Sequence, residues 1–331
     1  MVDKATALKL IAELEKMGEK KKLRSMQGEE EALMQWMRRV VDDHPAFQGV
    51  PQHLKDKMVV SPQSSAIAGN RKLRKLWKRE GGVVLFLYSG RSEGFHMKRA
   101  AKDLGFDVRK LIEVDIQNGS QWDMVSGELY AELVMMACDG QIGAVVASPN
   151  CRTRSRLRHV EVPSLPAPAR AWEGGEWGKE GISINEAVKC YEDDVMMLRA
   201  MMLYTIAEEM RKAKGESRPT SFLLEHPSPP KDIPAVVSWW RTPQWKALKE
   251  AYGLEEVDVD QGEIGGKGKK ATRLGGNVDV QLPPRCPMKP EGRKIEGKTP
   301  HQLVEESRQL SRWAPLLMTA ITEAVFKEIG R

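Results

Sequence analysis

The sequence predicts an α/β protein built on a doubly wound, mostly parallel β-sheet with added helices at its N- and C-terminal ends. Three features carry this prediction: short unbroken apolar runs, helical stretches between them, and glycine-rich or polar turns where the runs end. Strands that alternate with helices along a chain favour a parallel sheet covered on both faces. With 331 residues and 41% hydrophobic content, the chain can build a substantial core.

A helical N-terminal region is expected before the first strand. Residues 3–24 and 28–43 repeat apolar residues at helical spacing, and residues 61–69 have the composition of a flexible connection. We therefore predict a basic helical region over residues 1–80 and an α/β domain over residues 81–331.

Four apolar runs are predicted to form the parallel part of the sheet. They are rich in residues that favour strands, and they lie at residues 83–88, 111–115, 142–147 and 221–224. The helices expected between them start near residue 94 and end at residue 104, and cover residues 127–138 and 186–210. Four methionines in the last helix are interpreted as core filling: Met196, Met197, Met201 and Met202.

The C-terminal part of the chain is predicted to add two edge strands and a helix. Residues 256–260 and 277–282 alternate apolar and polar residues, and they bracket a glycine- and lysine-rich loop at residues 262–276. Residues 303–329 have helical spacing that Pro315 interrupts.

The net charge of +6 lies entirely in the first 80 residues, which hold 17 Lys and Arg against 11 Asp and Glu. Six of the nine residues from Arg71 to Arg79 are cationic, and a helix there could offer Arg71, Arg74 and Lys75 to phosphate groups. The alternative interpretation is a solvated helix face that only aids solubility.

Several protein classes are excluded by composition. No apolar run approaches the roughly 20 residues that cross a bilayer, and the first residues lack the pattern of a secretory signal. The four cysteines are widely separated and form no CxxC pair, so neither a disulfide framework nor a thiolate zinc site is predicted. We expect an intracellular protein with reduced thiols, no membrane partner and no bound metal.

A glycine turn follows the first predicted strand, at Ser89-Gly90-Arg91-Ser92-Glu93-Gly94-Phe95. In a doubly wound sheet such a turn lets backbone amides approach a nucleotide, and an acidic residue after the second strand binds its ribose. Glu113 and Asp115 are the candidates for the acid. The alternative is an ordinary tight connection with surface carboxylates nearby.

A cysteine follows the third predicted strand, in the segment Ser148-Pro149-Asn150-Cys151. Three arginines come within the next five residues, and guanidinium groups near a thiol lower its pKa. Glu225 ends the fourth strand. Because the carboxyl ends of parallel strands share one edge, we expect Cys151 and Glu225 to converge there.

These motifs, in this order, resemble those of the DNA (cytosine-5)-methyltransferases. The resemblance implies that S-adenosylmethionine is the cofactor, that Cys151 is the nucleophile and that Glu225 assists at the cytosine ring. It assigns the ribose acid to Glu113, with Asp115 beside it, and adenine contacts to Phe95 and Asp123. The glycine-turn motif is matched by Tyr88, Ser89, Gly90, Gly94 and Phe95.

The nearest resemblance is to the methyltransferase-like domains of dinoflagellate retrotransposon polyproteins, which share strings similar to residues 149–155, 237–242 and 311–315. It implies a DNA partner and a nuclear location. Four residues after the cysteine would then contact phosphate or a flipped nucleotide: Arg152, Arg154, Arg156 and His159.

A second hypothesis is a catalytically degenerate, nucleic-acid-binding module carried in a retroelement. The glycine pair of the family's turn is replaced here by Arg91-Ser92-Glu93, and the family's Gln-x-Arg-x-Arg segment is absent. The presence of both Cys151 and Glu225 favours the enzyme instead. A protein using another nucleotide would need a phosphate-binding Gly-Lys-Ser or Gly-Lys-Thr sequence, which the chain lacks.

Overall fold

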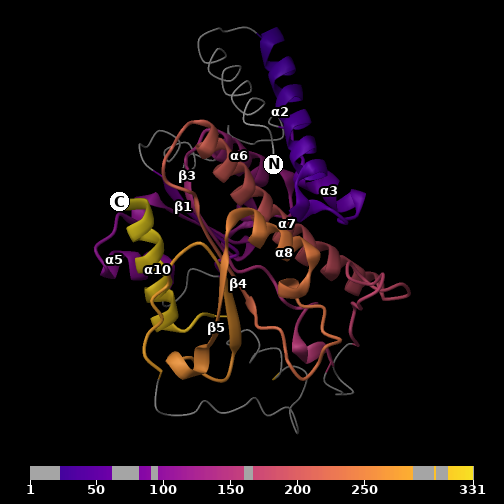
Figure 1. Cartoon of the computed structure of the whole chain (residues 1–331), viewed down its shortest axis with the longest axis vertical. Helices are drawn as coiled ribbons and strands as arrows, with labels where there is room; N and C mark the ends of the chain where they lie inside the picture. Colours follow the sequence, from indigo (N-terminus) through magenta and orange to yellow (C-terminus); the bar gives the residue numbers. More distant parts are fainter. Residues whose placement is uncertain are drawn as a thin grey trace.

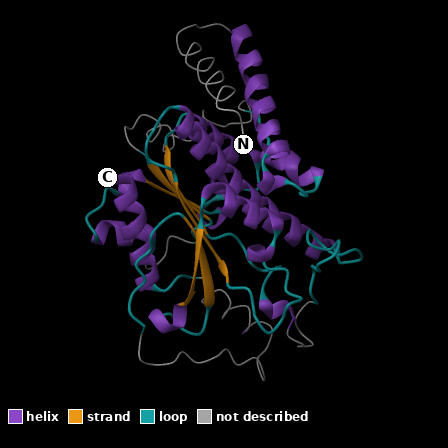
Figure 2. Cartoon of the chain, in the orientation of Figure 1, coloured by secondary structure: helices purple, strands orange, loops and turns teal. Residues whose placement is uncertain are grey.

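A computed structural model of the protein describes residues 23–61, 82–90, 96–159, 167–285, 302 and 312–330, with the side chains of residues 23–30 left out. It has an α/β fold in which helices flank a single mixed, mostly parallel sheet, compatible with a Rossmann-like architecture (Figures 1 and 2).

The sheet has six strands in the order β2-β1-β3-β4-β6-β5. Neighbouring strands from β2 to β4 are parallel, and β6 is antiparallel to both β4 and β5. Their bounds are β1 Val83–Leu87, β2 Leu111–Val114, β3 Ile142–Ala147, β4 Ser221–Pro227, β5 Glu255–Asp260 and β6 Ala271–Gly276. The four predicted parallel strands are therefore confirmed.

The last predicted strand is wrong. Residues 277–282 are not part of the sheet, and the strand is β6, which lies within the segment predicted to be a loop. It fills the space between β4 and β5, so only β5 is an edge strand on this side. Glycine makes this placement possible, because a Cβ on Gly276 would lie 1.9 Å from the carbonyl oxygen of Phe222.

Alternate residues of the central strands pack into two hydrophobic layers. Leu85 and Leu87 face one layer, and Val84 and Phe86 face the other. The first layer is covered by α6 Gly127–Cys138, α7 Ile184–Ala213 and α8 Pro243–Tyr252; the second is covered by α5 Met97–Asp103 and α10 Pro315–Gly330. Helices thus cover both faces, as expected for a doubly wound sheet.

The N-terminal helices join the first of these layers. They are α2 Leu23–Asp43, the short 3-10 helix η1 Pro45–Phe47 and α3 Gln52–Met58. Trp36, Phe47 and Leu54 are fully buried in the same cluster as the sheet. The domain boundary near residue 80 stays a prediction, because it lies outside the described residues, as do residues 3–22 of the first expected helix and the basic segment at residues 71–79. Residues 23 and 24 of that expected helix belong to α2.

Two features of the long helices follow the sequence closely. The four methionines of α7 are buried in the core, which confirms their interpretation as packing residues. Pro315 begins α10 rather than interrupting it, because the fixed φ of proline suits the first turn of a helix.

Among the described residues, no helix is both long and apolar enough to cross a membrane.

Candidate functional site

The carboxyl edge of the parallel strands is where a doubly wound sheet offers a binding site. Strand order reverses between β1 and β3, which gives a topological switch point. The register aligns Leu87 with both Val114 and Ala147, and Ala147 with Leu224. The chain segments that follow these residues, including the predicted site residues, therefore leave the sheet at one edge.

The turn after β1 is shaped by Tyr88 and Gly90. Both have positive φ angles, 61° and 75°, and the buried Tyr88 hydroxyl donates a 2.7 Å hydrogen bond to the carbonyl oxygen of Met196. Tyr88 therefore packs inward, toward α7. No atom of the described residues lies within 4 Å of where a Cβ on Gly90 would be. The Ser89 hydroxyl lies 3.4 Å from the carbonyl oxygen of Gly90, and the Ser89 amide donates to the carbonyl oxygen of Val114 at 3.3 Å. The predicted cofactor contacts Gly94 and Phe95 lie outside the described residues.

Asp115 ties this turn to β2. One of its carboxylate oxygens accepts a 2.8 Å hydrogen bond from the Gly90 amide, and the other accepts one of 2.8 Å from the Gln117 amide. The side chain of Asn118 donates to the carbonyl oxygen of Gly90 at 3.0 Å. The rim at the switch point is therefore built from hydrogen bonds within the chain.

The other two predicted cofactor acids, Glu113 and Asp123, also accept hydrogen bonds from backbone amides. Glu113 Oε1 lies 3.2 Å from His96 Nδ1 and accepts a 3.2 Å hydrogen bond from the Lys98 amide. Asp123 accepts a 2.8 Å hydrogen bond from the Val125 amide. Glu113 keeps 11% of its side-chain surface exposed at this edge.

Cys151 lies four residues beyond the end of β3 and is partly exposed. Burial of the thiol and the nearby carboxylate of Glu225 raise its pKa to about 11, and Lys270 acts in the opposite direction. The expected lowering by the following arginines is not found. At neutral pH Cys151 is a thiol, not a thiolate.

The arginines that follow Cys151 are paired with acids instead. Arg152 pairs with Asp193 at 2.8 Å and also with Glu192, while Arg154 pairs with Asp194 at 2.8 Å. Arg154 is only 5% exposed, so in this conformation it cannot contact nucleic acid as predicted. Its role is to hold the loop against α7.

The other predicted nucleic-acid contacts have different environments. Arg156 is exposed and pairs with Asp232 at 2.7 Å. His159 is partly exposed, and burial lowers its pKa. The predicted contacts Arg71, Arg74 and Lys75 lie outside the described residues.

A buried ionic network that the sequence did not indicate fixes the cysteine loop. Arg170 donates to Asp194 at 2.9 Å and to Thr153 Oγ1 at 3.0 Å, and Thr153 donates through its hydroxyl to Asp193 at 2.6 Å. These residues are nearly inaccessible to solvent. The signal available in the sequence was the pair of adjacent acids, Asp193 and Asp194, directly before the apolar run at residues 195–198.

Glu225 is the centre of the candidate site. It is 4% exposed, accepts a 2.5 Å hydrogen bond from Ser148 Oγ, and its Oε1 lies 3.3 Å from Lys270 Nζ. Burial alone would raise the pKa of Glu225, but Lys270 and Ser148, with His226 and Trp313, lower it below the usual value. Glu225 is therefore a carboxylate at neutral pH.

His226 points to the opposite face of β4 from Glu225, because successive residues of a strand alternate. It is 1% exposed and lies edge-on to Trp240, with ring centroids 6.5 Å apart. Burial lowers the pKa of His226 to about 4, so its ring is neutral at pH 7.

Lys270 is the functional candidate that sequence reasoning missed. It lies just before β6, which brings it beside β4 although the two segments are far apart in the chain. The lysine-rich composition of residues 267–270 was visible, but only the antiparallel pairing of β6 with β4 places one of these lysines against Glu225.

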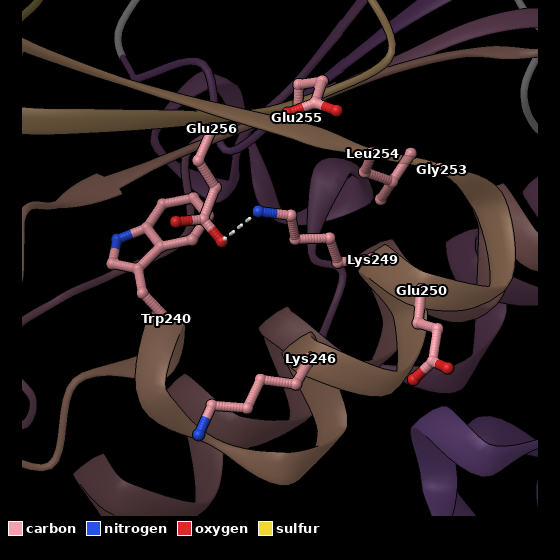
Figure 3. Close-up of a pocket in the computed structure, with 8 residues that line it drawn as sticks. All are labelled: Trp240, Lys246, Lys249, Glu250, Gly253, Leu254, Glu255 and Glu256. Carbon is pink, nitrogen blue, oxygen red and sulfur yellow. Dashed lines mark ion pairs between the residues drawn. The ribbon is translucent and has the colours of Figure 1, made fainter.

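The described residues contain no group of three His, Cys, Asp or Glu side chains that could hold a metal ion. One pocket of about 570 Å³ lies between α8 and the start of β5 (Figure 3). Lys249 and Glu256 form a 3.4 Å ion pair across it. Glu255 pairs with Gly276, and Gly276 pairs with Leu223, so the start of β5 is away from the edge that carries Glu225.

The chain was also compared with known proteins. No model of a protein family matches it, and no curated protein matches it.

Proposed function

We propose that the protein transfers a methyl group from S-adenosylmethionine to C5 of cytosine in DNA through a covalent cysteine adduct. The single observation that carries this proposal is the 2.5 Å hydrogen bond from Ser148 to Glu225, which joins the loop of Cys151 to the end of β4. The Glu225 carboxylate also raises the pKa of Cys151, which places the two groups near each other. A nucleophile and a carboxylate thus meet at one sheet edge.

The protonation states support a specific role for each group. Cys151 begins as a thiol and Glu225 as a carboxylate. The carboxylate accepts the thiol proton as the sulfur forms a bond to C6 of cytosine. The electron pair of the C5–C6 double bond moves toward N3, which takes that proton from Glu225.

When bound, the cofactor would supply an electrophilic methyl group from its sulfonium, which would leave as a neutral thioether. C5 is nucleophilic toward that methyl group once the Cys151 adduct has formed. Loss of the C5 proton to solvent re-forms the C5–C6 double bond and breaks the C6–S bond. The proton on N3 returns through Glu225 to the Cys151 sulfur, which restores the thiol and the carboxylate. Because C6 is hidden inside a duplex, the target base must be flipped out or lie in a single strand.

The residues at the switch point fit an adenosyl group. None of the described residues has an atom within 4 Å of a Cβ placed on Gly90, and Glu113 and Asp115 lie at the end of the neighbouring strand. Glu113 would hold the ribose hydroxyls, while Asp115 keeps the Gly90 turn in place. Asp123 would be the adenine-side acid.

A 5-fluorocytosine oligonucleotide tests the enzyme proposal, because fluorine at C5 prevents release of the adduct. With S-adenosylmethionine present, we expect the parent protein and Cys138→Ser to form a complex that survives denaturing electrophoresis, and Cys151→Ser to form none. Cys138 is a suitable control because it is a free cysteine buried under the sheet. A complex formed equally by Cys151→Ser would overturn the covalent mechanism.

A second candidate is a nucleic-acid-binding module of a retroelement without methyl transfer. The observation that favours it is the raised pKa of Cys151, since a thiol at about 11 is a poor nucleophile without an effective base. Titration calorimetry with S-adenosylmethionine distinguishes the two candidates. Binding of S-adenosylmethionine together with the 5-fluorocytosine complex supports the enzyme. Binding of nucleic acid without cofactor binding and without that complex supports the module. In both cases a DNA partner implies a nuclear location.

A further inference from the structure

The lysine-rich loop between the 3-10 helix η8 Gln261–Ile264 and β6 runs along the same edge as Glu225. Lys270 turns inward to Glu225, at 3.3 Å, whereas Lys267 and Lys269 are exposed. Neither exposed ammonium group forms an ion pair or hydrogen bond with any residue in the described part of the chain. The loop therefore offers two unneutralised cations next to the candidate site.

Hydrogen bonds fix the shape of this loop. Asp260 Oδ1 accepts from the amides of Gly262 and Lys270, at 3.0 and 2.9 Å, and so closes the loop at its base. The Gly266 amide donates to the carbonyl oxygen of Gln261 at 2.7 Å. A Cβ on Gly266 would lie 2.6 Å from that oxygen, so the close turn requires glycine. The two exposed lysines are thus presented from an anchored backbone.

The arginines of the cysteine loop cannot supply the same charge. Arg152 and Arg154 are each neutralised by acids of α7, and Arg156 is paired with Asp232. In the described part of this edge, a polyanion approaching Glu225 would therefore find unpaired positive charge on the lysine loop. Exposed lysines bind phosphodiester groups through their charge, and this binding does not depend on the base sequence.

We propose that Lys267 and Lys269 bind the phosphodiester backbone of the DNA strand whose cytosine enters the Cys151–Glu225 site. This inference rests on the proposed function, because it takes that site as the destination of the base. It assigns the backbone contact at this edge to the loop before β6 and leaves the arginines after Cys151 with a structural role.

The test is the salt dependence of binding to a fluorescein-labelled, single-stranded oligonucleotide that contains cytosine, measured by anisotropy with the full chain. Each phosphate contact on a single strand contributes about 0.7 to the slope of log affinity against log salt concentration. Lys267→Gln/Lys269→Gln should therefore lower the slope by about 1.4 and weaken binding at low salt. The matched control is Lys102→Gln/Lys246→Gln, which removes the same charge from exposed positions on α5 and α8.

A slope that falls in the loop variant and not in the control supports the inference. An unchanged slope in the loop variant overturns it, as does an equal fall in both variants, which would indicate a general charge effect. Trapping by 5-fluorocytosine is measured separately on the parent protein. If the parent protein is trapped but the slope of the loop variant is unchanged, the proposed function stands and only the lysine contact is overturned. If the slope falls but the parent protein is not trapped, the methyl transfer is overturned and the lysine contact stands.

Discussion

The Nζ atom of Lys270 lies 3.3 Å from Oε1 of Glu225, inside an edge of the sheet where the carboxylate is 4% exposed. This pair joins the loop before β6 to the end of β4. It lowers the pKa of Glu225 and also acts to lower the pKa of Cys151. Lys270 is thus the one described cation whose charge acts on both members of the candidate site.

Removal of this cation should make Cys151 less reactive. We expect Lys270→Gln to raise the pKa of Cys151 above about 11, because burial and the Glu225 carboxylate would then be opposed by no nearby cation among the main causes of the shift. The rate of alkylation by iodoacetamide at alkaline pH should fall about tenfold for each unit of pKa increase, since only the thiolate reacts. Mass spectrometry of the Cys151 peptide measures this rate. Lys269→Gln is the control, and equal rates in both variants would contradict the assignment of Lys270.

Loss of Asp194 should destabilise the protein severely. Asp194 pairs with Arg154 and Arg170, and all three side chains are at most 3% exposed. Asp194→Asn leaves two buried guanidinium groups without their carboxylate, which costs about 3–5 kcal/mol. Asp232→Asn is the control, because its pair with Arg156 is exposed and contributes less than about 1 kcal/mol. Urea unfolding measures both, and similar losses in the two variants would contradict a structural role for the network.

The glycine that lets β6 enter the sheet should not tolerate a side chain. Gly276→Ala would place a methyl group 1.9 Å from the backbone of Phe222, and the backbone cannot move without breaking the β4–β6 pairing. We expect a loss of more than about 2 kcal/mol in the free energy of unfolding. Gly127→Ala, at the start of α6 and with no atom within 4 Å of the added carbon, should leave stability nearly unchanged. A Gly276→Ala variant as stable as the parent would contradict the close pairing of β6 with β4.

Acid should destabilise the fold in part through His226. Burial lowers the pKa of His226 to about 4 in the folded state, whereas the unfolded chain titrates at 6.5. Between these values only the unfolded state binds the proton, so stability is greatest above pH 6.5 and falls as the pH decreases. The contribution lost by pH 5 is about 2 kcal/mol, at about 1.4 kcal/mol per unit.

His226→Phe keeps a ring of similar size and removes this titration. Urea unfolding at pH 7 and pH 5 should therefore give a smaller loss of stability for the variant than for the parent. His44, whose pKa burial also lowers to about 4, maintains part of the acid sensitivity in both proteins. An identical loss in the two proteins would show that His226 is not held neutral by the fold.

Local sequence patterns predicted most of the described secondary structure. The helix Gly127–Cys138 and the strand Ile142–Ala147 were predicted with the bounds that the structure has, because apolar periodicity and strand-forming residues are properties of short segments. The strand β6 was missed because its glycines disfavour strand formation locally. Its place depends on Gly275 packing under Trp240 and Trp245 and on Gly276 lying against β4, which are contacts between distant segments.

The sequence by itself determined that Cys151 and Glu225 lie at the carboxyl ends of two apolar runs, and parallel strands end at one edge of a sheet. Only the tertiary structure decided which charges surround them. It brings the acids of α7, 40 residues away, onto the arginines beside Cys151, and brings Lys270 onto Glu225. The electrostatic field at a site depends on distances in space rather than on separation along the chain. The arginines next to the cysteine in sequence therefore contribute less to it than Lys270, which lies just before β6.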